Sequence, residues 1–387
     1  MFHSFCYTFT FLFTTTLLFT PSSSSHIASQ PATKIFITDH NTQSFTNAGK
    51  GNIITGISQF KRYLSRFGYL KNNKPFSDEF DASFESALIQ YQRNLGLQVT
   101  AKLDSTTLSQ MITPRCGVQD TIKTHRNHIH NTTHFVYFPG KPRWSRDNDM
   151  PITLTYSFSR DYMIHNLSFQ EIRETFKRAF SKWSVVIPVK FVESKDYGFA
   201  DIKIGFYSGE HGDDEPFDGV LGVLAHSFLP EIGRLHLDAA ETWAVDFGVT
   251  KSEVAVDLES VATHEIGHLL GLSHSSVKEA VMYPSLRPRD KRADLNIDDI
   301  KGVQSLYGSN PNFRSQWSLE SDISTNHGTK FGLDTFKLSI IGFFIEFLGP
   351  GAWAKESEGG FRNPLITKRG KDGTCSPLNH ELDTFAP

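Results

Sequence analysis

Apolar residues recur at helical intervals in the first third of the chain. Two such runs predict amphipathic helices: Ile57, Phe60, Leu64 and Phe67, then Phe84, Leu88, Tyr91 and Leu95. Asp104 is a candidate N-cap for a short third helix that carries Leu108 and Met111. We therefore expect a small three-helix unit at about 50–115. The polar residues 26–50 before it are expected to be irregular.

The middle of the chain mixes strand and helix patterns. Segments 152–158, 190–192 and 200–206 favour strands, whereas 169–183 and 297–306 favour helices. Strand, helix, strands and further helices indicate an α+β fold, an α/β-type sandwich around a twisted mixed sheet. The polar stretch 121–133 is expected to be a linker, and 309–387 an irregular tail.

The two ends of the sequence bear on location. Residues 1–25 combine an apolar stretch with small residues and predict a secretory signal peptide. We expect a secreted monomer, extracellular or in a cell wall, with acceptors for glycosylation at Asn131 and Asn166. The apolar run 338–348 is short for a membrane span and is not terminal, so a membrane anchor is less favoured.

Charge and cysteine content limit the classes of function. The chain has 387 residues and a formal net charge of −3, which argues against nucleic acid as a partner. Its three cysteines are Cys6, Cys116 and Cys375, and no two of them are placed to form a disulfide bond within the folded domains. Bound metal ions are the obvious alternative source of stability.

The segment from His264 to His274 has the spacing of a catalytic zinc site. His264 and His268 stand four residues apart and share one face of a helix, with Glu265 beside them. His274 would lie about 15 Å further along a continuing helix, so the chain must turn back. Gly271 tolerates the backbone conformation that such a turn needs. A chance occurrence of this extended motif is a poor explanation.

The same segment resembles the metzincin zinc endopeptidases. Met282, in Val-Met-Tyr-Pro, matches the methionine turn that lies beneath the zinc histidines in that family. Ser275, directly after the third histidine, resembles the matrixins (matrix metalloproteinases), and the chain is similar to plant matrixins without a haemopexin domain. The resemblance implies a metzincin catalytic domain at 134–308 and a propeptide at 26–133, whose three helices resemble peptidoglycan-binding modules.

The chemistry of zinc enzymes suggests a role for each of the three histidines and for Glu265. Three histidines leave one position on zinc open for water, and Glu265 can act as the general base that takes its proton. The family's geometry implies that Leu224 and Ala225 pair with an extended polypeptide substrate. Leu286 stands where many matrixins have Tyr, so an apolar residue after the cut is expected but the pocket's shape is open.

A second group of potential metal ligands lies between residues 211 and 241. Three histidines and one carboxylate would close a tetrahedral structural site, and nearby carboxylates suit calcium; a plain hydrophilic loop is the alternative. By resemblance to matrixins, a structural zinc is held by His211, Asp213, His226 and His236. By the same resemblance, a calcium ion is held by Asp218, Asp238 and Glu241, with backbone carbonyls near Gly219, Leu221 and Val223. Asp201 would serve a second calcium, but its partner loop at 230–235 is shortened.

The isolated thiol of Cys116 has a distinctive setting. Pro-Arg-Cys-Gly-Val-Gln-Asp at 114–120 resembles the cysteine switch of matrixin zymogens. In that reading Cys116 occupies the open position on zinc, and Arg115 pairs with Asp120 to hold the segment in place. No dibasic site lies between Cys116 and Phe135, so the activating protease is unknown and self-cleavage stays open.

These observations predict a secreted zinc-dependent endopeptidase that is made as a latent zymogen, with two zinc ions and calcium. The alternative is a catalytically weak secreted protein that uses its N-terminal helices to bind the cell wall. A further alternative, a secreted binding protein on an inactive protease scaffold, would be attractive if Glu265 or one of the zinc histidines were replaced, and none is.

Overall fold

The structure is a computed structural model that describes residues 35, 37, 39–71, 75–120, 135–145 and 152–314. The predicted signal peptide and linker, and the predicted tail beyond residue 314, lie outside the described residues.

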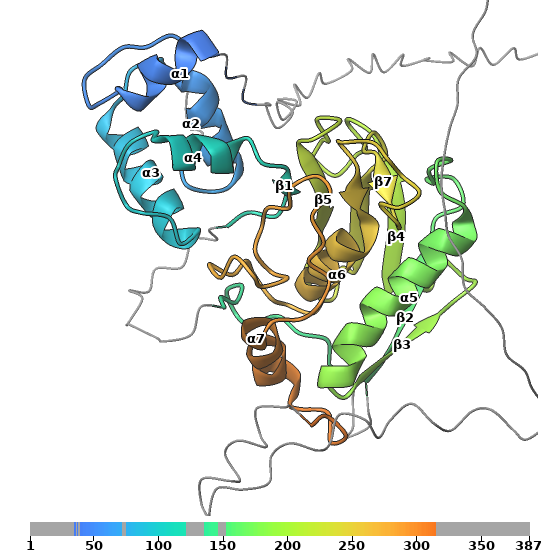
Figure 1. Cartoon of the computed structure of the whole chain (residues 1–387). Helices are drawn as coiled ribbons and strands as arrows, with labels where there is room; N and C mark the ends of the chain where they lie inside the picture. The colour runs from blue at the N-terminus through green and yellow to red at the C-terminus, as the bar shows by residue number, and fades with distance from the viewer. Residues whose placement is uncertain are drawn as a thin grey trace, which may run out of the picture. The chain divides into compact units, whose positions relative to one another are not determined.

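The N-terminal part is a helical unit, and its three predicted helices are confirmed. Its helices are α1 (Asp39–Thr46), α2 (Ile57–Arg66), α3 (Ala82–Asn94) and α4 (Ser105–Met111) (Figure 1). The Asp104 side chain accepts a hydrogen bond from the Thr107 backbone N–H and caps α4, as expected. The expectation that residues 26–50 are irregular is wrong for α1. This polar helix is held by one aromatic anchor, because the Phe45 ring packs 4.9 Å from the Phe60 ring.

The C-terminal part contains a six-stranded mixed sheet. Its strands are β1 (Arg115–Cys116), β2 (Ile152–Phe158), β3 (Val189–Glu193), β4 (Ile202–Tyr207), β5 (Val223–Ser227) and β6 (Arg234–Asp238), in the order β1-β5-β6-β4-β2-β3. Only β5 and β6 run antiparallel; the other neighbours are parallel. A separate parallel pair joins β7 (Trp243–Ala244) to β8 (Val256–Asp257). The predicted α+β class is therefore confirmed.

The sheet contains strands that the periodicity did not predict. Strands β2, β3 and β4 agree with the predicted segments to within two residues. The short strand β1 comes from the segment before the linker and pairs with β5, so it extends the sheet at its edge. The periodicity also missed β6, in which polar Arg234, His236 and Asp238 alternate with Leu235 and Leu237.

Three helices complete the C-terminal part: α5 (Phe169–Val186), α6 (Leu258–Leu269) and α7 (Ile297–Tyr307) (Figure 1). A capping box of Ser168 and Glu171 begins α5, and Asn296 with Asp299 does the same for α7. The indole N–H of Trp183 in α5 donates to the Thr263 carbonyl in α6 at 2.9 Å. This hydrogen bond ties the two helices together inside the core.

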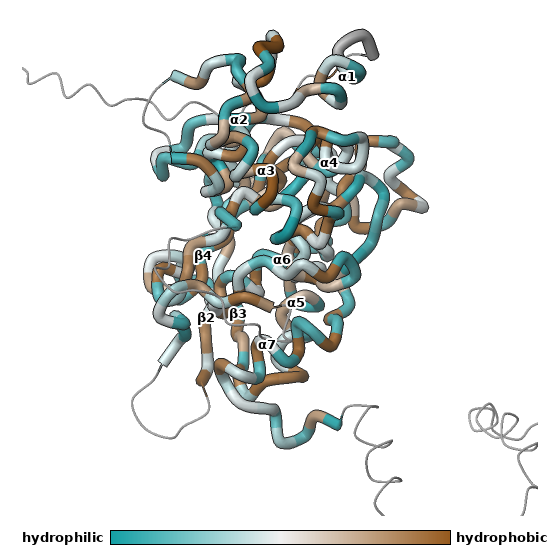
Figure 2. Tube along the Cα trace, turned by 90° about the vertical axis from the view of Figure 1, so that its left-hand side faces the viewer, coloured by the Kyte–Doolittle hydropathy of each residue, from teal (hydrophilic) through white to brown (hydrophobic). Residues whose placement is uncertain are grey.

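Two hydrophobic cores correspond to these two parts. One lies among the helices of the N-terminal part and extends to Phe217 and Val223 of the C-terminal part, and the other joins the inward faces of the sheet to α5, α6 and α7. Figure 2 shows β2 largely in brown, and the second half of this strand is buried in the core. Every residue of α6 is buried, so the metal-binding motif sits inside the protein and not on its surface. No helix among the described residues is long and apolar enough to cross a membrane.

The turn after α6 depends on glycine and generates the first prediction. Gly271 has φ of +98°, and a side-chain Cβ there would meet the Pro142 carbonyl. We expect Gly271→Ala to lower the free energy of unfolding by about 2–5 kcal/mol, through left-handed strain and overpacking together. Chemical denaturation of the full chain measures this change.

Gly140→Ala is the matched control for this turn. Gly140 also has positive φ, +82°, but nothing lies within 4 Å of the position of a Cβ. Its substitution should cost only the strain, about 1–2 kcal/mol. Equal losses in the two variants would show that close packing against Pro142 is not required.

Candidate active site

The helix α6 and the turn after it bring the three motif histidines together. The Nε2 atom of His268 lies 3.1 Å from that of His264 and 3.2 Å from that of His274. The Gly271 N–H donates to the His268 carbonyl at 2.8 Å, which ends the helix and lets the chain return. The predicted turn is confirmed.

Hydrogen bonds fix how each imidazole faces the cluster. His264 Nδ1 donates to the Val281 carbonyl at 2.6 Å, and His268 Nδ1 donates to the Leu272 carbonyl at 2.7 Å. His274 Nδ1 donates to the Asp120 carboxylate at 2.7 Å. With each proton on Nδ1, the three Nε2 lone pairs point at a common centre.

This donor set fits zinc. Burial lowers the pKa of all three histidines, so the rings are neutral and their lone pairs are available. Tetrahedral zinc with bonds of about 2.0–2.1 Å places its nitrogen ligands about 3.4 Å apart, close to the observed separations. Three lone pairs this close repel one another unless a cation lies between them.

Cys116 supplies a fourth donor. Its buried Sγ lies 3.4 Å from His268 Nε2. The ligand atoms of Cys116, His264, His268 and His274 all lie within 4.8 Å of one another. Burial raises the pKa of the Cys116 thiol well above its usual value, and a metal ion is the kind of neighbour that reverses such a shift.

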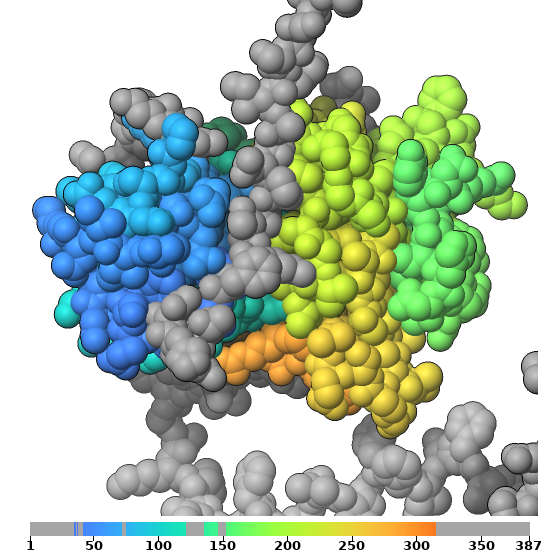
Figure 3. Space-filling model, turned by 90° about the horizontal axis from the view of Figure 1, so that it is seen from above, coloured from blue at the N-terminus to red at the C-terminus, as the bar shows by residue number. Residues whose placement is uncertain are grey.

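The segment around Cys116 is held on both sides by backbone hydrogen bonds. Toward β5, the Arg115 N–H donates to the Gly222 carbonyl at 3.0 Å and the Gly117 N–H to the Ala225 carbonyl at 2.8 Å. Toward the opposite wall, the Cys116 N–H donates to the Pro284 carbonyl at 2.9 Å. Figure 3 shows teal residues of this region against orange residues of the C-terminal part. The segment thus fills a cleft between two extended stretches.

The predicted pairing of Arg115 with Asp120 is confirmed. Arg115 Nη2 donates to Asp120 Oδ1 at 2.6 Å, and both side chains are almost wholly buried. The Arg115 guanidinium lies 3.6 Å from the centre of the Phe67 ring, and the Tyr69 hydroxyl donates to Asp120 Oδ2 at 2.8 Å. Sequence reasoning missed Phe67 and Tyr69, since in the sequence they are only helix-end residues about 50 positions away.

Glu265 lies next to the histidine cluster on the same helix. Its Oε2 accepts a hydrogen bond from the Ser227 hydroxyl at 2.8 Å, and its Oε1 has no hydrogen-bond partner among the described residues. Burial raises the pKa of Glu265 to about 7, against the opposing effect of the nearby Cys116 thiol and the Ser227 hydroxyl. A carboxylate with one uncommitted oxygen and a pKa near neutrality suits a general base. Sequence reasoning did not find Ser227.

Met282 lies under the zinc helix, as expected for a methionine turn. A Cβ on Gly267 of α6 would meet the Met282 sulfur, so only glycine allows this close packing. The Asp299 carboxylate accepts hydrogen bonds from the Val281 N–H at 2.8 Å and the Met282 N–H at 3.0 Å. Helix α7 therefore fixes the turn, and with it the carbonyl that orients His264.

A small cavity of about 20 Å³ opens beside His264 and Glu265. Leu286 lines one wall, and it is buried. Arg292 lines another and donates to the carbonyls of Tyr283 and Ser285 at 3.1 and 2.5 Å. This is the position at which a side chain of an extended peptide could enter.

The second histidine group also converges. Oδ2 of Asp213 lies 2.9 Å from His211 Nε2, 2.8 Å from His226 Nε2 and 2.7 Å from His236 Nδ1. The register of β5 and β6 places His226 directly opposite His236. Burial works to raise the pKa of Asp213, but the three histidines hold it well below its usual value. These four side chains could hold a tetrahedral metal ion.

The predicted calcium ligands gather nearby. The carboxylates of Asp218, Asp238 and Glu241 accept hydrogen bonds from the backbone N–H groups of Val223, Gly219 and Leu221. Burial raises the pKa of Glu241 to about 7, and its Oε2 is buried without a hydrogen-bond partner among the described residues. A calcium ion would supply the missing partner of this oxygen.

Asp201 has a structural contact of its own. Its Oδ2 accepts hydrogen bonds from the Thr155 N–H and hydroxyl, both at 2.8 Å, and so ties β2 to the start of β4. A second calcium at Asp201 stays a prediction.

Comparison with known proteins identifies the family. Residues 143–308 match the Matrixin peptidase family, and residues 55–111 match a peptidoglycan binding domain family. Metalloendoproteinase 4-MMP of Arabidopsis thaliana is 59% identical over 270 residues, 70% of this chain and 78% of that protein. Metalloendoproteinase 1-MMP of the same plant is 54% identical over 293 residues, 75% of this chain and 79% of that protein.

The similarity extends to animals. Human neutrophil collagenase is 40% identical over 257 residues, 64% of this chain and 50% of that protein. Zinc-dependent peptide hydrolysis is the property that defines this family, and the histidine cluster described above fits it. The chain therefore belongs to the matrixins, and it is a metalloendopeptidase.

Proposed function

We propose that this matrixin is a secreted endopeptidase made as a latent zymogen, in which Cys116 blocks the zinc and Glu265 is the general base. The convergence of Cys116 with three histidines, beside a carboxylate with an uncommitted oxygen, carries this proposal. Substrates are extracellular or cell-wall polypeptides.

The residues divide the chemistry among them. His264, His268 and His274 would hold a zinc ion, which would supply Lewis-acid activation of a water molecule and of the peptide carbonyl. Glu265 takes the proton from the attacking water and delivers it to the departing amine. Ser227 holds one oxygen of Glu265, which leaves the other free for this transfer.

The cleft that holds Cys116 is suited to an extended substrate. The carbonyls of Gly222, Ala225 and Pro284 now accept hydrogen bonds from the segment around Cys116. When that segment leaves, the same groups become available to a substrate backbone as an added strand. The cavity beside Leu286, which Leu224, Val261 and Val281 also line, is suited to an apolar side chain that follows the cut.

Metal ions also stabilise the fold in this proposal. The stretch before β5 has little regular structure, and bound ions would hold it in place. The structural zinc would be bound by His211, Asp213, His226 and His236, and the calcium by Asp218, Asp238 and Glu241. Since the described residues contain one cysteine, which is free, metal ions replace disulfides here.

The match to a peptidoglycan binding domain raises a second role, cell-wall binding by the helical unit. Its packing supports a propeptide instead. Gln110 Nε2 donates to the Ser285 hydroxyl at 2.7 Å, and the Tyr283 hydroxyl contacts Gln110 Oε1 at 3.1 Å. The helical unit thus uses its own polar groups to hold the wall of the cleft.

Replacement of the base tests the chemistry. We expect activated Glu265→Gln to keep its zinc but to lose about 10²–10⁴-fold in kcat, because the ligands remain and the proton acceptor does not. Peptide hydrolysis and elemental analysis measure the two properties. Glu259→Gln is the control on the same helix, since its carboxylate pairs with Arg178. Full activity in zinc-loaded Glu265→Gln would refute the mechanism.

Metal content tests the second cluster. Elemental analysis of the full chain should find about two zinc ions and at least one calcium ion per molecule. His226→Ala should lose one zinc and lower the melting temperature, whereas the exposed His165→Ala should do neither. A well-folded protein with a single zinc would exclude the structural site.

Latency tests the role of the thiol. The full chain should be inactive until an organomercurial or a protease acts on it, and Cys116→Ser should hydrolyse peptides without such treatment, since a serine hydroxyl is a weaker zinc ligand. Cys375→Ser should remain latent and controls for the loss of a thiol. If zinc-loaded Cys116→Ser is as latent as the parent, Cys116 is not the inhibitor.

A further inference from the structure

Asp120 accepts hydrogen bonds from His274 and Tyr69 in addition to its ion pair with Arg115. Its Oδ1 accepts hydrogen bonds from Arg115 Nη2 at 2.6 Å and from His274 Nδ1 at 2.7 Å. Its Oδ2 accepts one from the Tyr69 hydroxyl at 2.8 Å. The carboxylate therefore lies directly behind one of the zinc histidines, on the side away from the metal.

The three zinc histidines differ in what lies behind them. His264 and His268 donate to the backbone carbonyls of Val281 and Leu272, which belong to the same part of the chain as the histidines. His274 alone donates to a carboxylate, and that carboxylate lies in the segment that carries Cys116. A negatively charged acceptor makes an imidazole a stronger metal ligand than a neutral carbonyl does.

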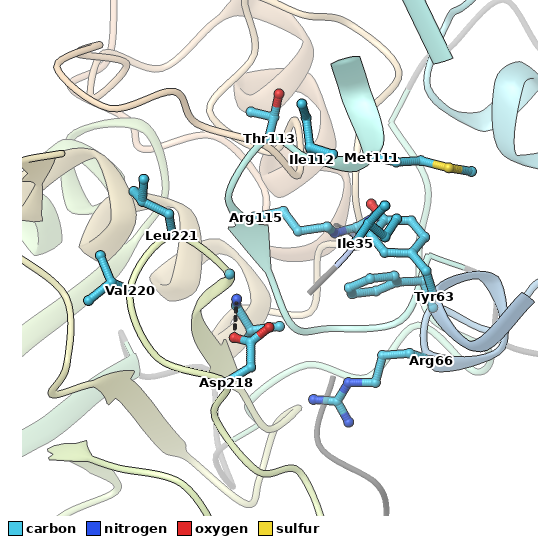
Figure 4. A pocket seen from close by; sticks show the side chains of 13 residues that line it. Ile35, Tyr63, Arg66, Met111, Ile112, Thr113, Arg115, Asp218, Val220 and Leu221 are labelled. Carbon is cyan, nitrogen blue, oxygen red and sulfur yellow. Dashed lines mark hydrogen bonds between the residues drawn. The ribbon is translucent and has the colours of Figure 1, made fainter. Parts of the chain in front are cut away.

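The surroundings keep the Asp120 carboxylate charged and in place. The Arg115 guanidinium lies 2.6 Å from the carboxylate and is equally buried, so it sets a positive charge directly against Asp120. Arg115 in turn lies over the Phe67 ring at 3.6 Å and 6.0 Å from the centre of the Tyr63 ring, and Figure 4 shows its side chain extending toward Tyr63. The Asp120 backbone N–H also donates to the Phe67 carbonyl at 3.2 Å.

We propose that Asp120 orients and strengthens His274 as a zinc ligand in the latent form, so that the propeptide contributes two groups to the metal centre. Cys116 binds from the open side, and Asp120 acts from behind His274. Removal of the propeptide then takes away both groups. The affinity of the mature enzyme for its catalytic zinc therefore falls by more than the loss of the Cys116 thiol alone would cause. This inference rests on the proposed zymogen function and extends it to metal retention.

The rate of zinc loss to a chelator, followed with a chromogenic zinc indicator in the full chain, tests the proposal. Loss of the charged acceptor should weaken zinc binding about tenfold or more, so Asp120→Asn should lose catalytic zinc correspondingly faster. The comparison is repeated in the Cys116→Ser background, where the thiol makes no contribution. A similar acceleration there is expected, because Asp120 acts through His274 and not through Cys116.

Tyr69→Phe is the matched control. It removes the hydrogen bond to Oδ2 of Asp120 but leaves Oδ1 on His274, so zinc loss should stay at the parent rate. In cobalt-substituted Asp120→Asn, a persisting thiolate-to-cobalt charge-transfer band would show that Cys116 is still bound. Unchanged zinc loss in Asp120→Asn, or equal acceleration in Tyr69→Phe, would overturn the proposal.

A measurement on the unmutated chain covers the case in which Asp120→Asn does not fold. Nitrogen-15 NMR of histidine-labelled protein should show His274 Nδ1–H shifted downfield by its charged acceptor, and the shift should be lost on propeptide removal. The His264 and His268 signals should persist. If the His274 signal does not change on removal, Asp120 is not its partner.

This result is separable from the proposed enzyme activity. Mature enzyme from Asp120→Asn has the same sequence as that from the parent, since residue 120 departs with the propeptide. Peptide cleavage by both, together with unchanged zinc retention in the full-length variants, would refute the role of Asp120 and leave the endopeptidase function standing. No cleavage by either would refute the function itself.

Discussion

Three imidazole lone pairs that face one point form the interaction on which the rest of the site depends. Nitrogen atoms 3.1–3.2 Å apart, each with a lone pair and no proton toward the others, are unfavourable without a cation. The fold supplies this arrangement by fixing the opposite nitrogen of each ring. The Nδ1 atom of His264 donates to a carbonyl of the methionine turn, and that of His268 donates to a carbonyl at the helix end. The Nδ1 atom of His274 donates to a carboxylate near Cys116. A metal ion relieves the repulsion and makes the arrangement stable.

Parts of the structure that are distant from the metal centre also position its histidine ligands. Asp299 on α7 holds the backbone of Val281 and Met282, and Val281 orients His264. Gly271 allows the chain to return so that His274 can join the cluster. Each of these elements is remote from the reaction, yet a change in any of them moves a ligand. The stability of the domain and the geometry of the site are therefore set by the same contacts.

Much of this could be predicted from the sequence, because the informative residues are close together in it. The zinc helix, its glycine turn and the third histidine lie within eleven residues, so local geometry alone predicts their convergence. Helices α2, α3 and α5 have strong apolar periodicity and were predicted for the same reason. Helix α1 was missed because it is polar and depends on Phe45 docking on Phe60.

Contacts between distant residues could not be predicted from local spacing, and only the resemblance to matrixins placed Cys116 at the zinc histidines. Asp120 and His274 are 154 residues apart, and Ser227 and Glu265 are 38 apart. No local spacing rule relates them, since the turns and strand register between them decide whether they meet. The histidines and carboxylates between residues 211 and 241 could be predicted only in part. Their ligand types suggested metal binding, but only the pairing of β5 with β6 sets His226 against His236.

X-ray absorption at the zinc edge tests the central claim most directly, since it reports the atoms bound to zinc in the full chain. The account predicts nitrogen or oxygen scatterers at about 2.0–2.1 Å and sulfur at about 2.3 Å, with about half a sulfur per zinc when both sites are filled. The sulfur contribution should vanish when the propeptide is removed, while the nitrogen contribution remains. A spectrum of the untreated, zinc-loaded full chain without sulfur would contradict the account.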